Sequence, residues 1–259
     1  MAKGLACTAR HFLLLLVSGT LTVAATSAAS AQVAPLAPMW LAGTPLPPVE
    51  TFADGLARHH IALTEAALIA ALEDPDGEAR SLAAAQLAAM DDHPALTAIL
   101  VALDDENDLQ VQVNLAGAAT WLGSQRALDR LQRLCQNLNV PATARLDAAR
   151  YVSNKEMSTC YPAVEQIEQT DQDANNRVLA LEAAVNYRGQ SDKAQALAVS
   201  ALSDIDPTVR IAAIQALRSL HATGVVDVLR HKLEMEGDAT VRDYLREAIR
   251  ILSIPDKQQ

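Results

Sequence analysis

The chain has 259 residues and a formal net charge of −10, and half of its residues are hydrophobic although only 3% are aromatic. The apolar fraction excludes a disordered chain, three cysteines exclude a disulfide framework, and the negative charge disfavours non-specific nucleic-acid binding. Ten glycines are few for the frequent turns of a β-sandwich or barrel, so the composition indicates helices packed through small and aliphatic side chains.

The first 31 residues have the pattern of a secretory signal peptide. Lys3 and Arg10 precede an apolar run at 12–17, and small residues then lead to Ala29-Ser30-Ala31. This order predicts cleavage after Ala31 and a periplasmic or secreted protein. The alternative is an uncleaved anchor, the only membrane contact we expect, although its apolar stretch is short for a bilayer span. Cleavage would remove two basic residues and no acidic one, which takes the net charge from −10 to −12.

Residues 32–51 form a proline-rich linker ahead of the domain predicted over 52–259. Five of the eleven prolines lie in this linker, at positions 35, 38, 45, 47 and 48. Because proline lacks the N–H group that a helix or central strand needs, we expect an extended segment.

From residue 52 onward the sequence repeats one unit. Its aligned second position, usually arginine, falls at residues 80, 114, 145, 177, 210 and 242. The spacing between successive copies is nearly constant, and a near-constant spacing of this size is typical of a solenoid built from helix pairs. The second helix of each pair is expected to begin near this position, after a turn such as Asp206-Pro207, where aspartate fits the N-cap and proline the first turn. The first helices are expected over 60–72, 94–104, 125–138, 161–170, 191–203 and 223–235.

The repeat resembles a known family. Residues 204–217 read Asp-x-Asp-Pro-x-Val-Arg-x-Ala-Ala-x-x-Ala-Leu, which resembles the HEAT-repeat signature, and the period is similar to that of bacterial HEAT-like repeats, which also occur in phycobilin lyases. The resemblance covers about residues 52–252; Asn114 and Asp147 depart from the pattern. It implies an all-α, right-handed α-solenoid (an ARM-like α-α superhelix) of about six HEAT-like helix pairs with a binding role.

The aligned aspartates and arginines are expected to be structural. In a stack of repeats, aspartates cap the second helices and arginines lie beside neighbouring loops, and the acidic surroundings disfavour a phosphate site. The expected ladder comprises Asp74, Arg80, Arg145, Arg177, Asp206, Arg210 and Arg242.

A row of aliphatic residues predicts a partner-binding groove on the second helices. Helical geometry turns Ile211 and Arg218 away from the buried stripe of their helix, and the repeat carries these positions through the chain. A contiguous exposed apolar strip marks a partner site. The predicted groove for a peptide or helix comprises Leu115, Leu146, Val178 and Ile211, with Leu122, Val185 and Arg218 further along the same face. The alternative is that curvature buries these residues between helices.

Cys135 and Cys160 are predicted to be unpaired thiols. Export favours a disulfide, but the repeat register separates the two cysteines by seven positions on adjacent helices, beyond bridging distance. The loop at 154–159 is long enough to disturb this register.

No catalytic or metal-binding motif stands out in the sequence. It contains no Cys-x-x-Cys or His-Glu-x-x-His, and the acidic stretch 104–108 lacks the glycine and closing glutamate of a calcium loop. We therefore expect no cofactor, no catalytic residue and no nucleic-acid partner, and interpret the chain as a non-catalytic scaffold or adaptor for a protein or peptide. The alternatives are a lyase-like or metal-dependent enzyme using His59, His60 or His93, and an envelope-stabilising structural protein.

Overall fold

The structure is a computed structural model that describes residues 51–153 and 157–254. The predicted signal peptide, and all but the last residue of the predicted linker, lie outside the described residues. Every regular element in the described ranges is a helix, and none of these helices is long and apolar enough to cross a membrane. The chain divides into two compact units, residues 1–95 and 96–259, which are described separately.

The first unit contains one helix pair preceded by a further helix of seven residues. Its helices are α2 (Phe52–Arg58), α3 (Glu65–Ala71) and α4 (Gly77–Ala89), followed by the 3₁₀ turn His93–Ala95. Both α2 and α3 pack against α4. The first helix of the pair, expected from residue 60, begins later because Thr64 caps it and His60 adopts the left-handed φ of 57°.

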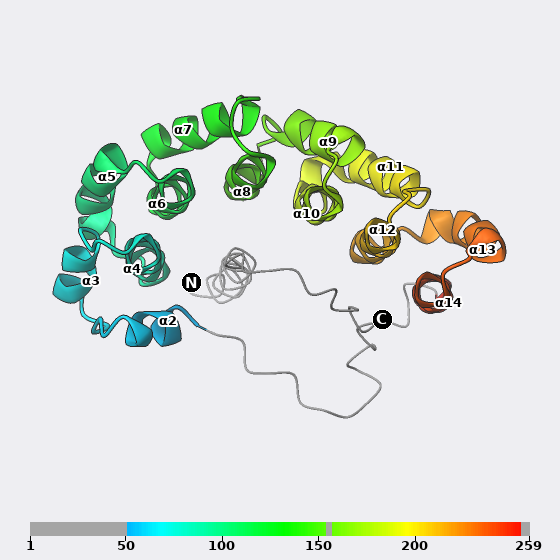
Figure 1. The fold of residues 1–259 in the computed structure, drawn as a ribbon, viewed down its shortest axis with the longest axis horizontal. Helices are drawn as coiled ribbons and strands as arrows, with labels where there is room; N and C mark the ends of the chain where they lie inside the picture. The colour runs from blue at the N-terminus through cyan, green and yellow to red at the C-terminus, as the bar shows by residue number, and fades with distance from the viewer. Residues whose placement is uncertain (1–50, 154–156, 255–259) are drawn as a thin grey trace, which may run out of the picture. The chain divides into compact units, whose positions relative to one another are not determined.

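The second unit contains five helix pairs. They are α5 (Leu96–Asp105) with α6 (Leu109–Trp121), α7 (Gln125–Gln136) with α8 (Ala142–Ser153), α9 (Tyr161–Thr170) with α10 (Ala174–Ala184), α11 (Ser191–Ala201) with α12 (Pro207–Ser219), and α13 (Val226–Met235) with α14 (Ala239–Leu252). Within this unit the second helices follow the inner side of an arc and the first helices follow its outer side (Figure 1). The predicted α-solenoid of about six helix pairs is confirmed.

Aspartates set the start of most inner helices. Asp108, Asp173, Asp206 and Asp238 are the N-caps of α6, α10, α12 and α14, and each side chain accepts a bond from a backbone N–H in the first turn. Such caps satisfy donors that have no partner within the helix. The caps therefore define equivalent positions more reliably than the apolar pattern does.

This register corrects the alignment of the second copy. Gln112, not Asn114, lies at the arginine position, because its Nε2 donates to the Glu106 carbonyl six residues earlier at 2.8 Å. Arg177 makes the same bond to the Asp171 carbonyl at 2.9 Å. With Gln112 in place, every step of the repeat is 32 or 33 residues.

The core contains few aromatic rings, and three of them are the buried tyrosines Tyr151, Tyr161 and Tyr187. The Tyr187 hydroxyl donates to the Ala149 carbonyl at 2.7 Å, and its ring meets that of Tyr161 edge-on. Tyr151 packs against Gly117 of α6, where a methyl group would overlap the tyrosine ring. Elsewhere the contacts are made by alanine, leucine, isoleucine and valine, as the composition predicts.

The prediction of two unpaired thiols is wrong. Cys135 and Cys160 form a disulfide, with their Cα atoms 5.8 Å apart. The prediction assumed that successive first helices lie side by side in register, whereas α7 and α9 follow one another along the outer side of the arc (Figure 1). Cys135 in the last turn of α7 therefore meets Cys160 at the N-cap of α9.

The disulfide is open to a direct chemical test. Under non-reducing conditions, mass mapping should find the tryptic peptide 134–145 joined to the peptide 156–177. The double variant Cys135→Ser/Cys160→Ser should lose about 3 kcal/mol of unfolding free energy, because a cross-link restricts the unfolded chain. Two separate peptides in the oxidised protein would contradict the pairing.

Gly117 should tolerate no side chain. Gly117→Ala is expected to cost about 1–3 kcal/mol of stability through overlap with Tyr151, which outweighs the helix propensity gained by alanine. Thermal melting measures the loss, and Gly224→Ala, where an added Cβ meets nothing within 4 Å, is the control. A Gly117→Ala protein as stable as the wild type would show that α6 and α8 have room to separate.

Candidate functional site

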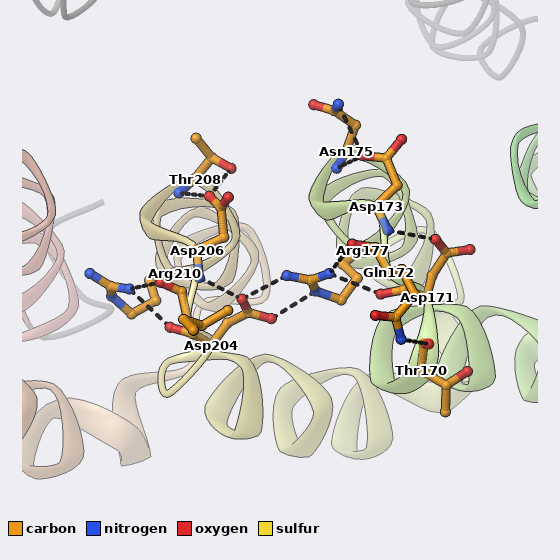
Figure 2. Close-up of polar contacts among 11 residues, drawn as sticks. Thr170, Asp171, Gln172, Asp173, Asn175, Arg177, Asp204, Asp206, Thr208 and Arg210 are labelled. Atoms are coloured by element: carbon orange, nitrogen blue, oxygen red, sulfur yellow. Dashed lines mark hydrogen bonds and ion pairs between the residues drawn. The ribbon is translucent and has the colours of Figure 1, made fainter.

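A ladder of charged residues joins consecutive repeats of the second unit. It lies at the loops that connect the first and second helix of each pair, which we call the loop edge. The Nε and Nη2 atoms of Arg177 donate to the two carboxylate oxygens of Asp204, each at 2.8 Å, and Nη1 donates to the Asp171 carbonyl (Figure 2). Asp204 also accepts from the Asp206 backbone N–H at 2.8 Å. Arg177 thus ties the start of α10 to the loop before α12.

Arg210 repeats this geometry one unit further on. Its Nε and Nη2 donate to both carboxylate oxygens of Glu236 at 2.9 Å, while Nη1 donates to the Asp204 carbonyl. Asp206 is the N-cap of α12, as predicted, and its carboxylate accepts from the Thr208 N–H at 2.8 Å. The ladder carboxylates are therefore the residues two positions before the caps.

The remaining predicted ladder residues differ in their contacts. Arg145 is buried; its Nε donates to the Cys135 carbonyl at 3.0 Å, and burial lowers the pKa of its guanidinium. In the first unit, Arg80 donates to the carbonyls of Asp74 and Pro75. Arg242 lies exposed on α14. Bidentate arginine–carboxylate pairs between repeats are thus formed by Arg177 and Arg210.

An open pocket adjoins the Arg177–Asp204 pair. It is lined by residues 168–172, 177, 200–201 and 203–205, which come from α9, α10, α11 and the loops that follow α9 and α11. Glu168 in this lining is only 5% exposed, and it accepts no hydrogen bond from any described residue. Burial raises the pKa of its carboxyl to about 7; nearby Asp204 also raises it, and Arg177 lowers it.

Glu168 was not among the site residues expected from the sequence. It is one of several glutamates on amphipathic helices, and no motif distinguishes it from a surface residue. Its burial arises where the last turn of α9 packs beside the α11–α12 loop, a contact set by the stacking of repeats.

The predicted solvent-facing row is wrong for three of its residues. Leu115, Leu146 and Leu122 are buried, with exposed fractions of 0%, 1% and 2%. Leu115 and Leu122 come from the copy that was misaligned by two positions. Leu146 lies one turn from Arg150 on α8, whose guanidinium reaches across to Glu182 of α10 at 3.1 Å. The predicted groove therefore does not extend over α6 and α8, because contacts between the inner helices bury these side chains.

The other predicted groove residues are partly exposed. Val178 and Val185 lie on α10 and at its C-cap, and Ile211 and Arg218 lie on α12. Because α12 packs against α10, α11 and α14, its exposed mid-helix stripe faces the inner side of the arc. We call Val178, Glu182, Ile211, Gln215 and Arg218 the inner patch; all five are half-buried or exposed.

The histidines proposed for the enzyme alternative all lie in the first unit. His59 is 3.7 Å from a carboxylate oxygen of Asp76 and equally far from one of Glu78, while His93 lies 3.5 Å from Asp91. His60 is exposed. Across residues 51–153 and 157–254, no three histidine, cysteine or acidic side chains are grouped so that they could hold a metal ion.

Part of the chain matches the model of a known family. Residues 161–250 match the family model for HEAT repeats. The matched segment covers α9 to α14 except for the last residues of α14, and so includes the ladder arginines and the pocket. No curated protein matches the chain.

The ladder should contribute measurably to stability. Arg177→Ala is expected to cost about 2–3 kcal/mol, because it leaves Asp204 and two loop carbonyls without their donor in a partly buried site. Arg230→Ala, which removes an exposed i,i+3 pair with Asp227, should cost at most about 0.5 kcal/mol. Equal losses in chemical denaturation would show that the ladder is no stronger than a surface ion pair.

Proposed function

We propose that this chain, whose residues 161–250 are HEAT repeats, is an exported, non-catalytic scaffold or adaptor that binds a protein or peptide on its inner patch. HEAT repeats form helical scaffolds that often mediate protein interactions, since stacked repeats present an extended curved surface. The observation that carries the proposal is the inner patch itself, where apolar side chains stay accessible on the concave side of α10 and α12.

The composition of the inner patch suits an amphipathic partner. Val178 and Ile211 supply apolar area, and Glu182, Gln215 and Arg218 surround them with polar groups of both charges. An apolar centre with a polar rim is the usual arrangement of a protein interface. Glu247 and Arg250 on α14 form a partly exposed ion pair, and Glu247 also interacts with Arg218, so this pair extends the polar rim.

Two independent features support export. The N-terminal segment has the three parts of a secretory signal, and a disulfide joins Cys135 to Cys160. Structural disulfides persist in oxidising compartments and are rare where thiols are kept reduced. A periplasmic or extracellular location accounts for both features.

The binding role can be tested by affinity capture from envelope extract with matched variants. The wild type should retain a discrete protein, and Ile211→Asp should lose it because a charge then occupies the centre of the inner patch. Val228→Asp, a substitution of an exposed valine on the outer helix α13, should retain the same protein. Both variants should melt within a few degrees of the wild type.

Two outcomes would contradict the proposal, each in a different part. Retention of the protein by Ile211→Asp would move the binding site away from the inner patch. If neither the wild type nor Val228→Asp retains anything above a bare resin, the scaffold proposal fails.

A further inference from the structure

The pocket beside Arg177 is lined mainly by hydrogen-bond acceptors, and four of the five N–H groups of Arg177 already donate to Asp204 or to loop carbonyls. The Asp171 carboxylate accepts from the Asp173 N–H and the Asn176 amide, and Asp204 is held by Arg177. Glu168 is the one carboxylate in the pocket lining without a hydrogen bond from the described residues.

We propose that this pocket binds the ammonium or guanidinium group of a lysine or arginine side chain from a partner peptide, with Glu168 as its counter-ion. The inference rests on the proposed function and adds a second contact point, on the loop edge rather than on the inner patch. A buried carboxylate that accepts no hydrogen bond is costly, and a cation that enters the pocket offsets that cost. The pocket should therefore prefer a positively charged ligand.

The local charge favours a cation. The pocket lining holds three carboxylates, Glu168, Asp171 and Asp204, against the single guanidinium of Arg177, a formal charge of −2. The loop edge adds further carboxylates in the caps Asp173 and Asp206. A surface of one sign raises the encounter rate with oppositely charged partners.

The rim of the pocket supplies an apolar contact. Ile205 stands at the tip of the α11–α12 loop with 93% of its surface exposed, and it lines the same pocket as Glu168. An isoleucine so exposed gains free energy when a partner covers it. The expected ligand is therefore a peptide in which a basic residue lies next to an apolar one.

Binding should depend on pH through Glu168. The charged groups around it are Asp204 and Asp171 from the loops, Arg177 from α10, and on α9 itself Glu165, with Tyr161 one turn further. Since the cation stabilises the ionised carboxyl, affinity should fall as pH drops through about 7. A ligand that needs the protonated carboxyl would instead bind more tightly as pH drops.

The experiment uses short random peptides displayed on phage and selected on the full chain. The enriched peptides should carry lysine or arginine beside an apolar residue. In fluorescence anisotropy with an enriched peptide, Glu168→Gln should weaken binding about tenfold or more, and replacing the peptide's lysine by norleucine should do the same. Glu165→Gln, a matched change on α9 outside the pocket, should bind like the wild type.

A second variant shows whether binding can be weakened without loss of the fold. Ile205→Ser changes a fully accessible loop side chain, so it should leave melting unchanged while weakening the peptide severalfold. Binding at about pH 8 should exceed binding at about pH 6 for the wild type and should be flat for Glu168→Gln. Free putrescine as competitor distinguishes a site for small polyamines, which would displace the peptide at comparable concentration, from one that needs a peptide chain.

The results also separate this inference from the scaffold proposal. Enriched peptides that are insensitive to Glu168→Gln, or that lack basic residues, overturn the pocket proposal alone. Binding of putrescine that depends on Glu168, without any enriched peptide, contradicts the peptide-binding function but keeps the cation site. No enrichment and no putrescine binding overturn the pocket proposal, whereas the scaffold proposal fails when the wild type captures nothing from envelope extract.

Discussion

The N-capping aspartate of the inner helices is the constraint on which the repeat geometry depends. It fixes the first residue of the helix, and so places an arginine or glutamine in the first turn, where it donates to the loop carbonyl six residues earlier. The same turn presents an acidic side chain two residues before the cap, and in two loops this side chain pairs with the arginine of the preceding repeat. One local motif thus joins neighbouring repeats.

The third repeat lacks this motif and is held differently. Pro141 occupies the position of the capping aspartate, and Arg145 turns to the Cys135 carbonyl and to Gln166 of α9. The disulfide, the packed tyrosines and the Arg150–Glu182 pair lie in this same region. Covalent and buried contacts therefore connect the repeats where the charged ladder is interrupted, and they close the inner surface over α8.

This division sets where the chain offers accessible chemistry. Over α6 and α8 the inner positions are buried or bridged by polar contacts, so the accessible inner surface of the second unit begins at α10. On the loop edge of those same repeats, Arg177 donates to Asp204 and to loop carbonyls, and Glu168 accepts no hydrogen bond from the described residues. The pocket thus adjoins the ion pair that joins these two repeats.

The sequence by itself determined the helix pairs, their period and the capping aspartates, because these are local: apolar periodicity, turn residues and caps act within a few positions. It misplaced α6 by two residues, since a run of alanines and aliphatics fits several registers. Only the tertiary structure decided that Cys135 meets Cys160, that Leu146 is buried and that Glu168 lines a pocket. Each of these depends on how one repeat is displaced and turned against the next, a geometry set by side-chain packing between repeats rather than by residue spacing within one.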